Sequence, residues 1–237
     1  MSICYRKKQT ILLILLIGMA ALLGSCLDFF SNSWASWAAR DPSSLIPAVT
    51  LDNVNDLIEM AENDPDLSLA LLLRIGEAVD DASDEEKAAL QAAAVEAAVN
   101  AVGLGQTIAG AAGDFANISD VDSAIDVIMD AINNMPNLDE VSEALFDLLP
   151  APGSGEFNTF IENATAEEIA LAAILLLAGE AKKYDSDPNH NIHNFDISGE
   201  GSDEAELAKA LAMSLTTIQD ELPPNLYDIL SGLNLIN

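Results

Sequence analysis

Apolar residues recur every three to four positions through most of the chain after residue 52, the spacing that places them on one face of an α-helix. The first predicted helix, near residues 53–63, carries such a stripe at Val54, Leu57, Ile58 and Ala61. No segment shows the strict alternation of apolar and polar residues that is typical of a half-buried strand. The pattern therefore predicts an all-α fold.

Residues that favour helix starts mark several boundaries. Asp64 stands before Pro65, so we expect an N-cap followed by a proline in the first turn, where its missing N–H costs nothing. The segments Ser83–Glu86 and Thr165–Glu168 have the spacing of capping boxes. Each box precedes a long run of alanine and large aliphatic residues.

Two of the predicted helices are apolar almost all round. The helix that ends near Val102 has only a thin polar edge, formed by Gln91, Glu96 and Asn100, and the later helix holds an unbroken apolar run from Ile169 to Gly179. Such helices are typically buried, so we expect both at the centre of the domain. The other helices are predicted near 65–79, 119–134, 136–149, 157–161 and 202–219, with a last one from Pro224.

Together these elements predict an irregular helical bundle, or a short solenoid, of antiparallel helix hairpins. Three inter-helix joints match one another, at Asp64–Leu67, Met135–Leu138 and Pro223–Leu226. They suggest helical units at 52–102, 119–183 and 202–237, although their irregular spacing leaves true repetition open. The glycine-rich stretch that starts at Gly103 follows a helix rather than a strand, so we interpret it as a helix break.

The chain begins with a short cationic segment followed by an apolar run from Ile11 to Leu23, the layout of a secretory signal peptide. The residues Leu23, Gly24, Ser25 and Cys26 resemble the lipobox of bacterial lipoproteins. The resemblance implies cleavage before Cys26, which becomes the lipidated, palmitate-carrying first residue of the mature chain. It also implies a membrane anchor in the cell envelope, and Leu27 after the cysteine favours the outer membrane.

On this interpretation, residues 1–25 are the signal peptide, 26–51 the lipidated N-terminus and tether, and 52–237 the all-α domain. Two alternatives stay open. An uncleaved membrane span fits less well, because an apolar run of about 13 residues is shorter than the roughly 20 that a bilayer needs. Cleavage without lipidation would favour an Ala-x-Ala-like site, which the sequence lacks here.

The predicted tether holds three aromatic residues at helical spacing, Phe30, Trp34 and Trp37. On a short helix they would share one face, and aromatic rings favour the membrane–water interface. We therefore interpret them as a membrane-interface segment beside the anchor. The alternative is that the rings fold back onto the domain.

The excess of acidic over basic residues in the predicted mature chain restricts the partners that it can bind. Six basic and 39 acidic residues remain after the predicted cleavage, a formal net charge of −33. Such a chain repels nucleic acid, so no nucleic-acid partner is expected. A basic protein partner or a cationic ligand stays compatible with the charge.

One acidic loop resembles the calcium-binding loop of EF-hand proteins. Calcium prefers six to eight oxygen ligands, and alternate residues of a curved loop can supply them. The resemblance implies calcium ligands at Asp185, Asp187, Asn189, Asn191 and Asp196. His190 replaces the usual glycine and Asp196 the usual glutamate, so a solvated loop between helices is the alternative.

The sequence offers few residues for catalysis. Cys26 is committed to lipid and Cys4 leaves with the signal peptide, so no cysteine nucleophile or thiol chemistry is expected in the domain. His190 and His193 are the only histidines, and zinc binding by this pair is a weaker alternative to calcium. We therefore predict a protein that is not an enzyme and needs no cofactor.

Two functions fit these observations. The first is a non-enzymatic, lipid-anchored scaffold or partner-binding module of the cell envelope, because stacked helices offer extended binding faces. The second is a lipoprotein that binds a small ligand between its alanine-rich and leucine-rich helices, with calcium at 185–196 as an addition.

Overall fold

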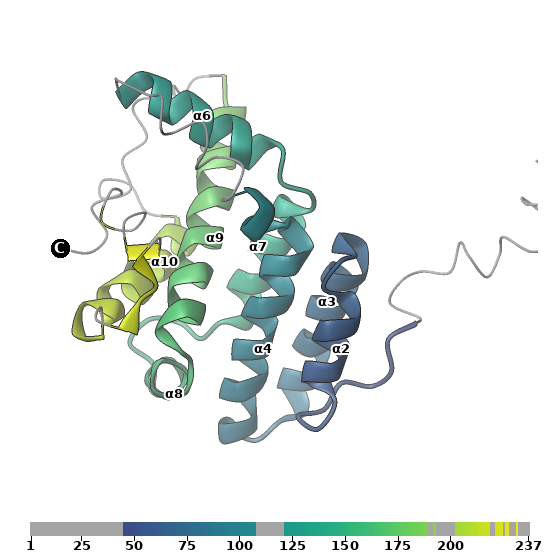
Figure 1. Cartoon of the computed structure of the whole chain (residues 1–237). Coiled ribbons are helices and arrows are strands. Elements are labelled where there is room, and N and C mark those ends of the chain that lie inside the picture. The colour runs from purple at the N-terminus through teal and green to yellow at the C-terminus, as the bar shows by residue number, and fades with distance from the viewer. Residues whose placement is uncertain are drawn as a thin grey trace, which may run out of the picture. The chain divides into compact units, whose positions relative to one another are not determined.

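The computed structural model describes residues 45–107, 121–188 and 202–218, together with Ile192, residues 221–224, Leu226, Tyr227 and Ser231. Its elements are all helical and confirm the predicted all-α fold (Figure 1). They are α2 (Val54–Ala61), α3 (Pro65–Asp81), α4 (Asp84–Val102), α6 (Val121–Asn133), α7 (Leu138–Leu148), α8 (Gly155–Asn163), α9 (Ala166–Ser186), α10 (Asp203–Ser214) and the short 3₁₀ helix η4 (Leu215–Thr217). Within the described ranges, no helix has the length and apolar character needed to cross a bilayer.

Helices α4 and α9 form the centre of the bundle, as their all-round apolar sequences predict. Helix α3 packs along α4, α9 contacts α4, and α10 packs on the other side of α9 (Figure 1). Only Ala82 and Ser83 separate α3 from α4, so these two helices form a hairpin. Helices α7 and α8 close the bundle against α4 and α9.

The predicted helix starts are confirmed by hydrogen bonds. The side chain of Asp64 accepts from the backbone N–H of Leu67 at 3.1 Å, with Pro65 in the first turn of α3. Thr165 and Glu168 form a capping box, in which the Thr165 N–H donates to Glu168 Oε2 at 2.7 Å and Glu168 N–H to Thr165 Oγ1 at 3.2 Å. A second capping box joins Ser83 and Glu86. These bonds satisfy backbone N–H groups that a helix leaves unpaired at its N-terminus.

Two residues with positive φ lie close together at one end of the bundle. One ends helix α4 and the other precedes helix α7. Gly103 caps the C-terminus of α4 with φ at 62°, a conformation that glycine adopts without a Cβ penalty. This confirms the predicted helix break. Asn137, with φ at 54°, precedes α7, and its amide donates to the Pro65 carbonyl at 3.4 Å. Two of the three matching joints therefore lie side by side.

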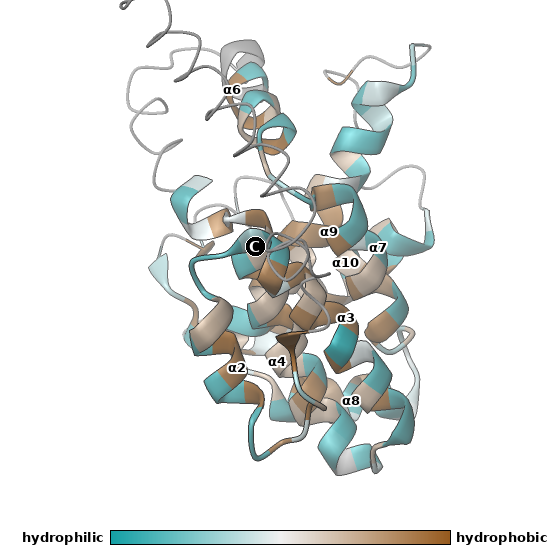
Figure 2. Ribbon diagram, turned by 90° about the vertical axis from the view of Figure 1, so that its right-hand side faces the viewer, coloured by the Kyte–Doolittle hydropathy of each residue, from teal (hydrophilic) through white to brown (hydrophobic). Residues whose placement is uncertain are grey.

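The core consists mainly of small and aliphatic side chains. Phe160 is the only aromatic residue among the largest side chains that are fully buried in the described part of the chain. Hydrophobic stretches colour α3, α4 and α9, whose buried apolar residues belong to one core cluster (Figure 2). Alanines fill much of α4 and α9, and small side chains let helix axes approach closely.

The structure differs from the sequence-based description in three places. Gln91, expected on the exposed polar edge of α4, is only 6% exposed, because its Nε2 donates to the Leu148 carbonyl at 2.9 Å. Helix α9 also extends to Ser186, past the position where a loop was predicted to begin. Ile46 and Val49, which the sequence placed in the tether, are buried within the core, so the packed domain begins before residue 52.

Candidate functional site

The residues of the predicted anchor lie outside the part of the chain that the structure describes. This applies to the signal motif Leu23, Gly24 and Ser25, to the lipidation site Cys26, and to the membrane-interface residues Phe30, Trp34 and Trp37. Their assignments stay predictions.

The predicted calcium loop is described only in part. Asp185 lies in the last turn of α9 and Asp187 is its C-cap residue, whereas Asn189, Asn191 and Asp196 fall outside the described residues, as do His190 and His193. Among the side chains that can be placed, no three His, Cys, Asp or Glu residues are grouped so as to hold a metal ion. The calcium assignment therefore stays a prediction.

The structure brings together a group of carboxylates that the sequence did not reveal. A hollow of about 400 Å³ opens between α2 and α4. Its lining is formed by three carboxylates, two amides and one aliphatic side chain: Glu59, Glu62, Glu96, Asn55, Asn100 and Ile58. We call this feature the acidic hollow.

The surroundings of Glu96 in the acidic hollow disfavour its negative charge. Partial burial raises the pKa of Glu96, and the negative charges of Glu168, Glu62 and Glu167 raise it further. Glu62 also caps the C-terminus of α2, where the helix dipole adds negative potential. A positive group placed here would relieve this repulsion, because an opposite charge favours the ionised carboxylate.

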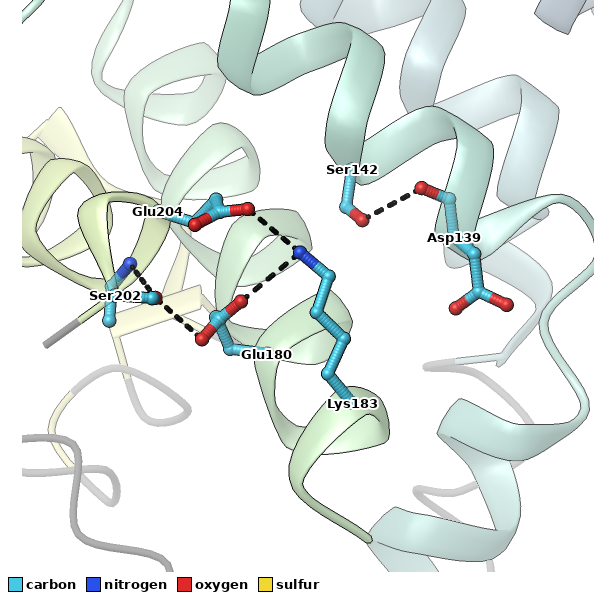
Figure 3. Close-up of polar contacts among 7 residues, drawn as sticks. Asp139, Ser142, Glu180, Lys183, Ser202 and Glu204 are labelled. Atoms are coloured by element: carbon cyan, nitrogen blue, oxygen red, sulfur yellow. Dashed lines mark hydrogen bonds and ion pairs between the residues drawn. The ribbon is translucent and has the colours of Figure 1, made fainter. Parts of the chain in front are cut away.

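A contrasting charge cluster joins α9 to α10, and we call it the Lys183 bridge. Lys183 Nζ lies 2.8 Å from Glu204 Oε1 and 3.3 Å from Glu180 Oε1. The Ser202 hydroxyl donates to Glu180 Oε2 at 2.5 Å and accepts from the Ala205 N–H at 3.1 Å. Figure 3 shows the Glu180 carboxylate between Lys183 and Ser202.

The pKa shifts in the Lys183 bridge reflect this pairing. Partial burial alone would lower the pKa of Lys183, but the hydrogen bonds to Glu204 and Glu180 outweigh it and raise the pKa. The hydrogen bond from Lys183 lowers the pKa of Glu204 against the effect of burial. Both shifts stabilise the charged forms, so the bridge is satisfied within the protein.

The opposite side of α9 is also closely fitted. Lys182 Nζ pairs with Asp139 Oδ2 on α7 at 2.8 Å. The Ser142 hydroxyl donates to the Asp139 carbonyl on the same helix (Figure 3). A Cβ atom at Gly179 would lie 2.5 Å from Ser142 Oγ, so only glycine permits this approach of α7 to α9.

Sequence reasoning missed the acidic hollow because its carboxylates come from separate helices. Glu59 and Glu62 are three residues apart on α2, which indicates a shared face, but nothing in the sequence places Glu96 of α4 beside them. In a chain with 39 acidic residues, a pair of this kind carries little signal.

Comparison of the chain with protein-family models, with curated proteins and with solved structures gave no match.

Proposed function

We propose that this protein is a lipid-anchored, non-enzymatic scaffold of the cell envelope, delivered to the outer membrane, whose helical body binds a basic protein partner. The acidic hollow is the observation that carries the partner-binding part. Its three carboxylates line one surface cavity. The pKa of Glu96 is raised first by partial burial and then by the negative charges of Glu168, Glu62 and Glu167, so a bound cation would favour its ionised form.

The distribution of the few cations supports the same proposal. Among the described residues, Arg74 pairs with Glu77, Lys182 with Asp139, and Lys183 with Glu180 and Glu204. At least three of the six basic residues that would remain after cleavage are therefore engaged in intramolecular ion pairs. Among the residues that the structure describes, no lysine or arginine lines the acidic hollow. A lysine or arginine of a partner would supply the missing charge and find carboxylate and amide oxygens as acceptors.

Calorimetric titration with hexalysine at low and physiological salt tests the acidic hollow. Replacing Glu59, Glu62 and Glu96 together by glutamine is expected to weaken hexalysine binding at least about tenfold. The matched control replaces the exposed Glu140, Glu143 and Glu206 by glutamine, with the same change in charge, and is expected to alter affinity by less than about twofold. Equal losses in both variants would show that overall charge binds the peptide, and would overturn the assignment to the hollow.

The anchor is tested separately at Cys26. In a bacterial host, the wild-type chain is expected to incorporate labelled palmitate and to sediment with outer membranes. Cys26→Ala is expected to lose both the label and the sedimentation, because the thiol is the site of acylation. Labelled palmitate retained in Cys26→Ala would contradict the lipoprotein assignment without affecting the hexalysine result.

A further inference from the structure

A second surface hollow lies between the N-terminal halves of α4 and α8 and has a mixed polar lining. Its volume is about 480 Å³, within the range of pockets that hold small molecules. It is lined by Asp84, Lys87, Ala88 and Gln91 of α4 and by Ser154, Gly155, Glu156 and Thr159 of α8 and its N-cap. We call it the polar hollow.

Gln91 is a buried, hydrogen-bonded polar residue in the lining of this hollow. The residue is only 6% exposed, and its Nε2 donates to the Leu148 carbonyl at 2.9 Å. This bond sets which way the amide faces, because only the nitrogen can donate to a carbonyl. Among the described residues none donates to Gln91 Oε1, so a held acceptor is available to a donor in the polar hollow.

The rest of the lining offers both signs of charge. Asp84 and Glu156 supply carboxylates, and Lys87 supplies an ammonium group. The Ser154 hydroxyl oxygen accepts from the Phe157 N–H at 3.0 Å, which leaves its own hydrogen for an acceptor. The N-terminus of α8 adds partial positive charge, and Gly155 leaves it open, because apart from its chain neighbours and its own helix backbone no described atom lies within 4 Å of where a Cβ would stand.

We propose that the polar hollow binds a small zwitterion with an ammonium and a carboxylate group, the chemistry of a free α-amino acid. The ammonium group finds acceptors in Gln91 Oε1 and the carboxylates of Asp84 and Glu156. The carboxylate finds donors in Lys87, the Ser154 hydroxyl and the first turn of α8. A simple anion would meet two carboxylates and a simple cation would meet Lys87, so a ligand carrying both charges fits the lining best.

This site is independent of the partner-binding surface, because the polar hollow and the acidic hollow share no residue. The experiment screens the proteinogenic amino acids by thermal shift on the whole protein, then measures the tightest one by calorimetry. That amino acid is expected to bind at least about tenfold more tightly than its N-acetyl or its carboxamide derivative, each of which lacks one charge. If no amino acid raises the melting temperature at millimolar concentration, or if both derivatives bind as well as the parent, the proposal is wrong.

Two lysine variants localise the binding. Lys87→Gln is expected to weaken binding at least about tenfold, whereas the matched Lys209→Gln on α10 is expected to change it by less than about twofold. Gln91→Met keeps the side-chain volume but removes the acceptor, and is expected to weaken binding while helical circular dichroism is retained. Unchanged binding in Lys87→Gln would overturn the assignment to this hollow. Hexalysine affinity in the same variant separates a failure here from a failure of the partner-binding proposal.

Discussion

The Lys183 bridge and the acidic hollow both consist mainly of carboxylates, but only the bridge pairs them with a lysine. At the bridge, one lysine is placed between Glu180 and Glu204 and links α9 to α10. At the hollow, Glu59, Glu62 and Glu96 share one lining, to which no lysine or arginine of the described residues contributes. Cations are scarce in this chain, so their placement separates carboxylates that are paired within the fold from carboxylates that have no cation beside them in the described lining.

The two pKa shifts express this difference in a measurable form. Glu204 is held charged by Lys183, and its pKa lies below the ordinary value of 4.5. Glu96 is opposed by burial and by neighbouring carboxylates, and its pKa lies above that value. The bridge therefore stabilises the fold when ionised, whereas the ionised hollow destabilises it.

The largest expected effect comes from disturbing the packing of α9 against α7. Gly179→Ala would place a Cβ atom 2.5 Å from Ser142 Oγ and push α9 away from α7. Overpacking of this kind typically costs about 2 kcal/mol in the free energy of unfolding. In a domain of this size we expect a melting temperature lower by about 6 °C, measured by calorimetry.

Gly76 on α3 is the matched control for Gly179. A Cβ there would meet Leu148 Cδ1 at 3.6 Å, an ordinary contact. Gly76→Ala is therefore expected to stabilise the protein by about 0.5 kcal/mol, because alanine restricts the unfolded chain and favours the helix. If both substitutions had the same sign, α7 and α9 would not approach as closely as described.

Lys183→Met breaks the bridge itself and has a smaller expected effect. Lys183 is 46% exposed, so solvent screens the pair, and we expect a loss of about 1 kcal/mol at pH 7. Because the pKa of Glu204 is lowered in the folded state, this contribution is complete above pH 4.5 and disappears as the pH falls through the folded pKa. Urea unfolding from pH 7 down to pH 3 measures it.

Lys209→Met removes the same charge from α10 at a position outside the bridge. It is expected to change stability by less than about 0.5 kcal/mol at every pH. A Lys183→Met penalty that stayed constant below pH 4.5 would mean that Lys183 contributes by packing rather than by pairing with Glu204.

Local patterns in the sequence were sufficient to predict where the helices begin and which of them are buried. Asp64 and the capping residues of α4 and α9 act within one turn, so their hydrogen bonds could be predicted from spacing alone. The burial of α4 and α9 followed from their lack of a polar face. Gln91 could not be placed, because its partner is the carbonyl of Leu148, a residue on the distant helix α7.

The candidate site depends on contacts that no local pattern encodes. Lys183 reaches Glu204 across 21 residues, and Glu96 lies beside Glu62 only because α2 packs on α4. The sequence instead drew attention to the contiguous loop at 185–196, of which the structure describes only a part. Contiguous motifs are visible in a sequence, whereas a site assembled from several helices appears only after the helices are packed.

Glu96→Gln has the smallest expected effect and tests the hollow most directly. At pH 8 the substitution is expected to stabilise the protein by about 0.5 kcal/mol or less, since Glu96 is only partly buried and solvent screens its charge. Because the pKa of Glu96 is raised in the folded state, wild type takes up a proton on folding as the pH falls. The stabilisation by Glu96→Gln is therefore complete above the folded pKa of Glu96 and disappears below pH 4.5, whereas the stabilisation by the Lys183 bridge is lost at low pH.

A second measurement on Glu96 uses hexalysine. The peptide is expected to lower the Glu96 pKa, measured by side-chain carboxyl NMR, because a bound cation favours the carboxylate. If Glu96→Gln destabilised the protein at pH 8, Glu96 would already have a cationic partner and the contrast with the Lys183 bridge would fail.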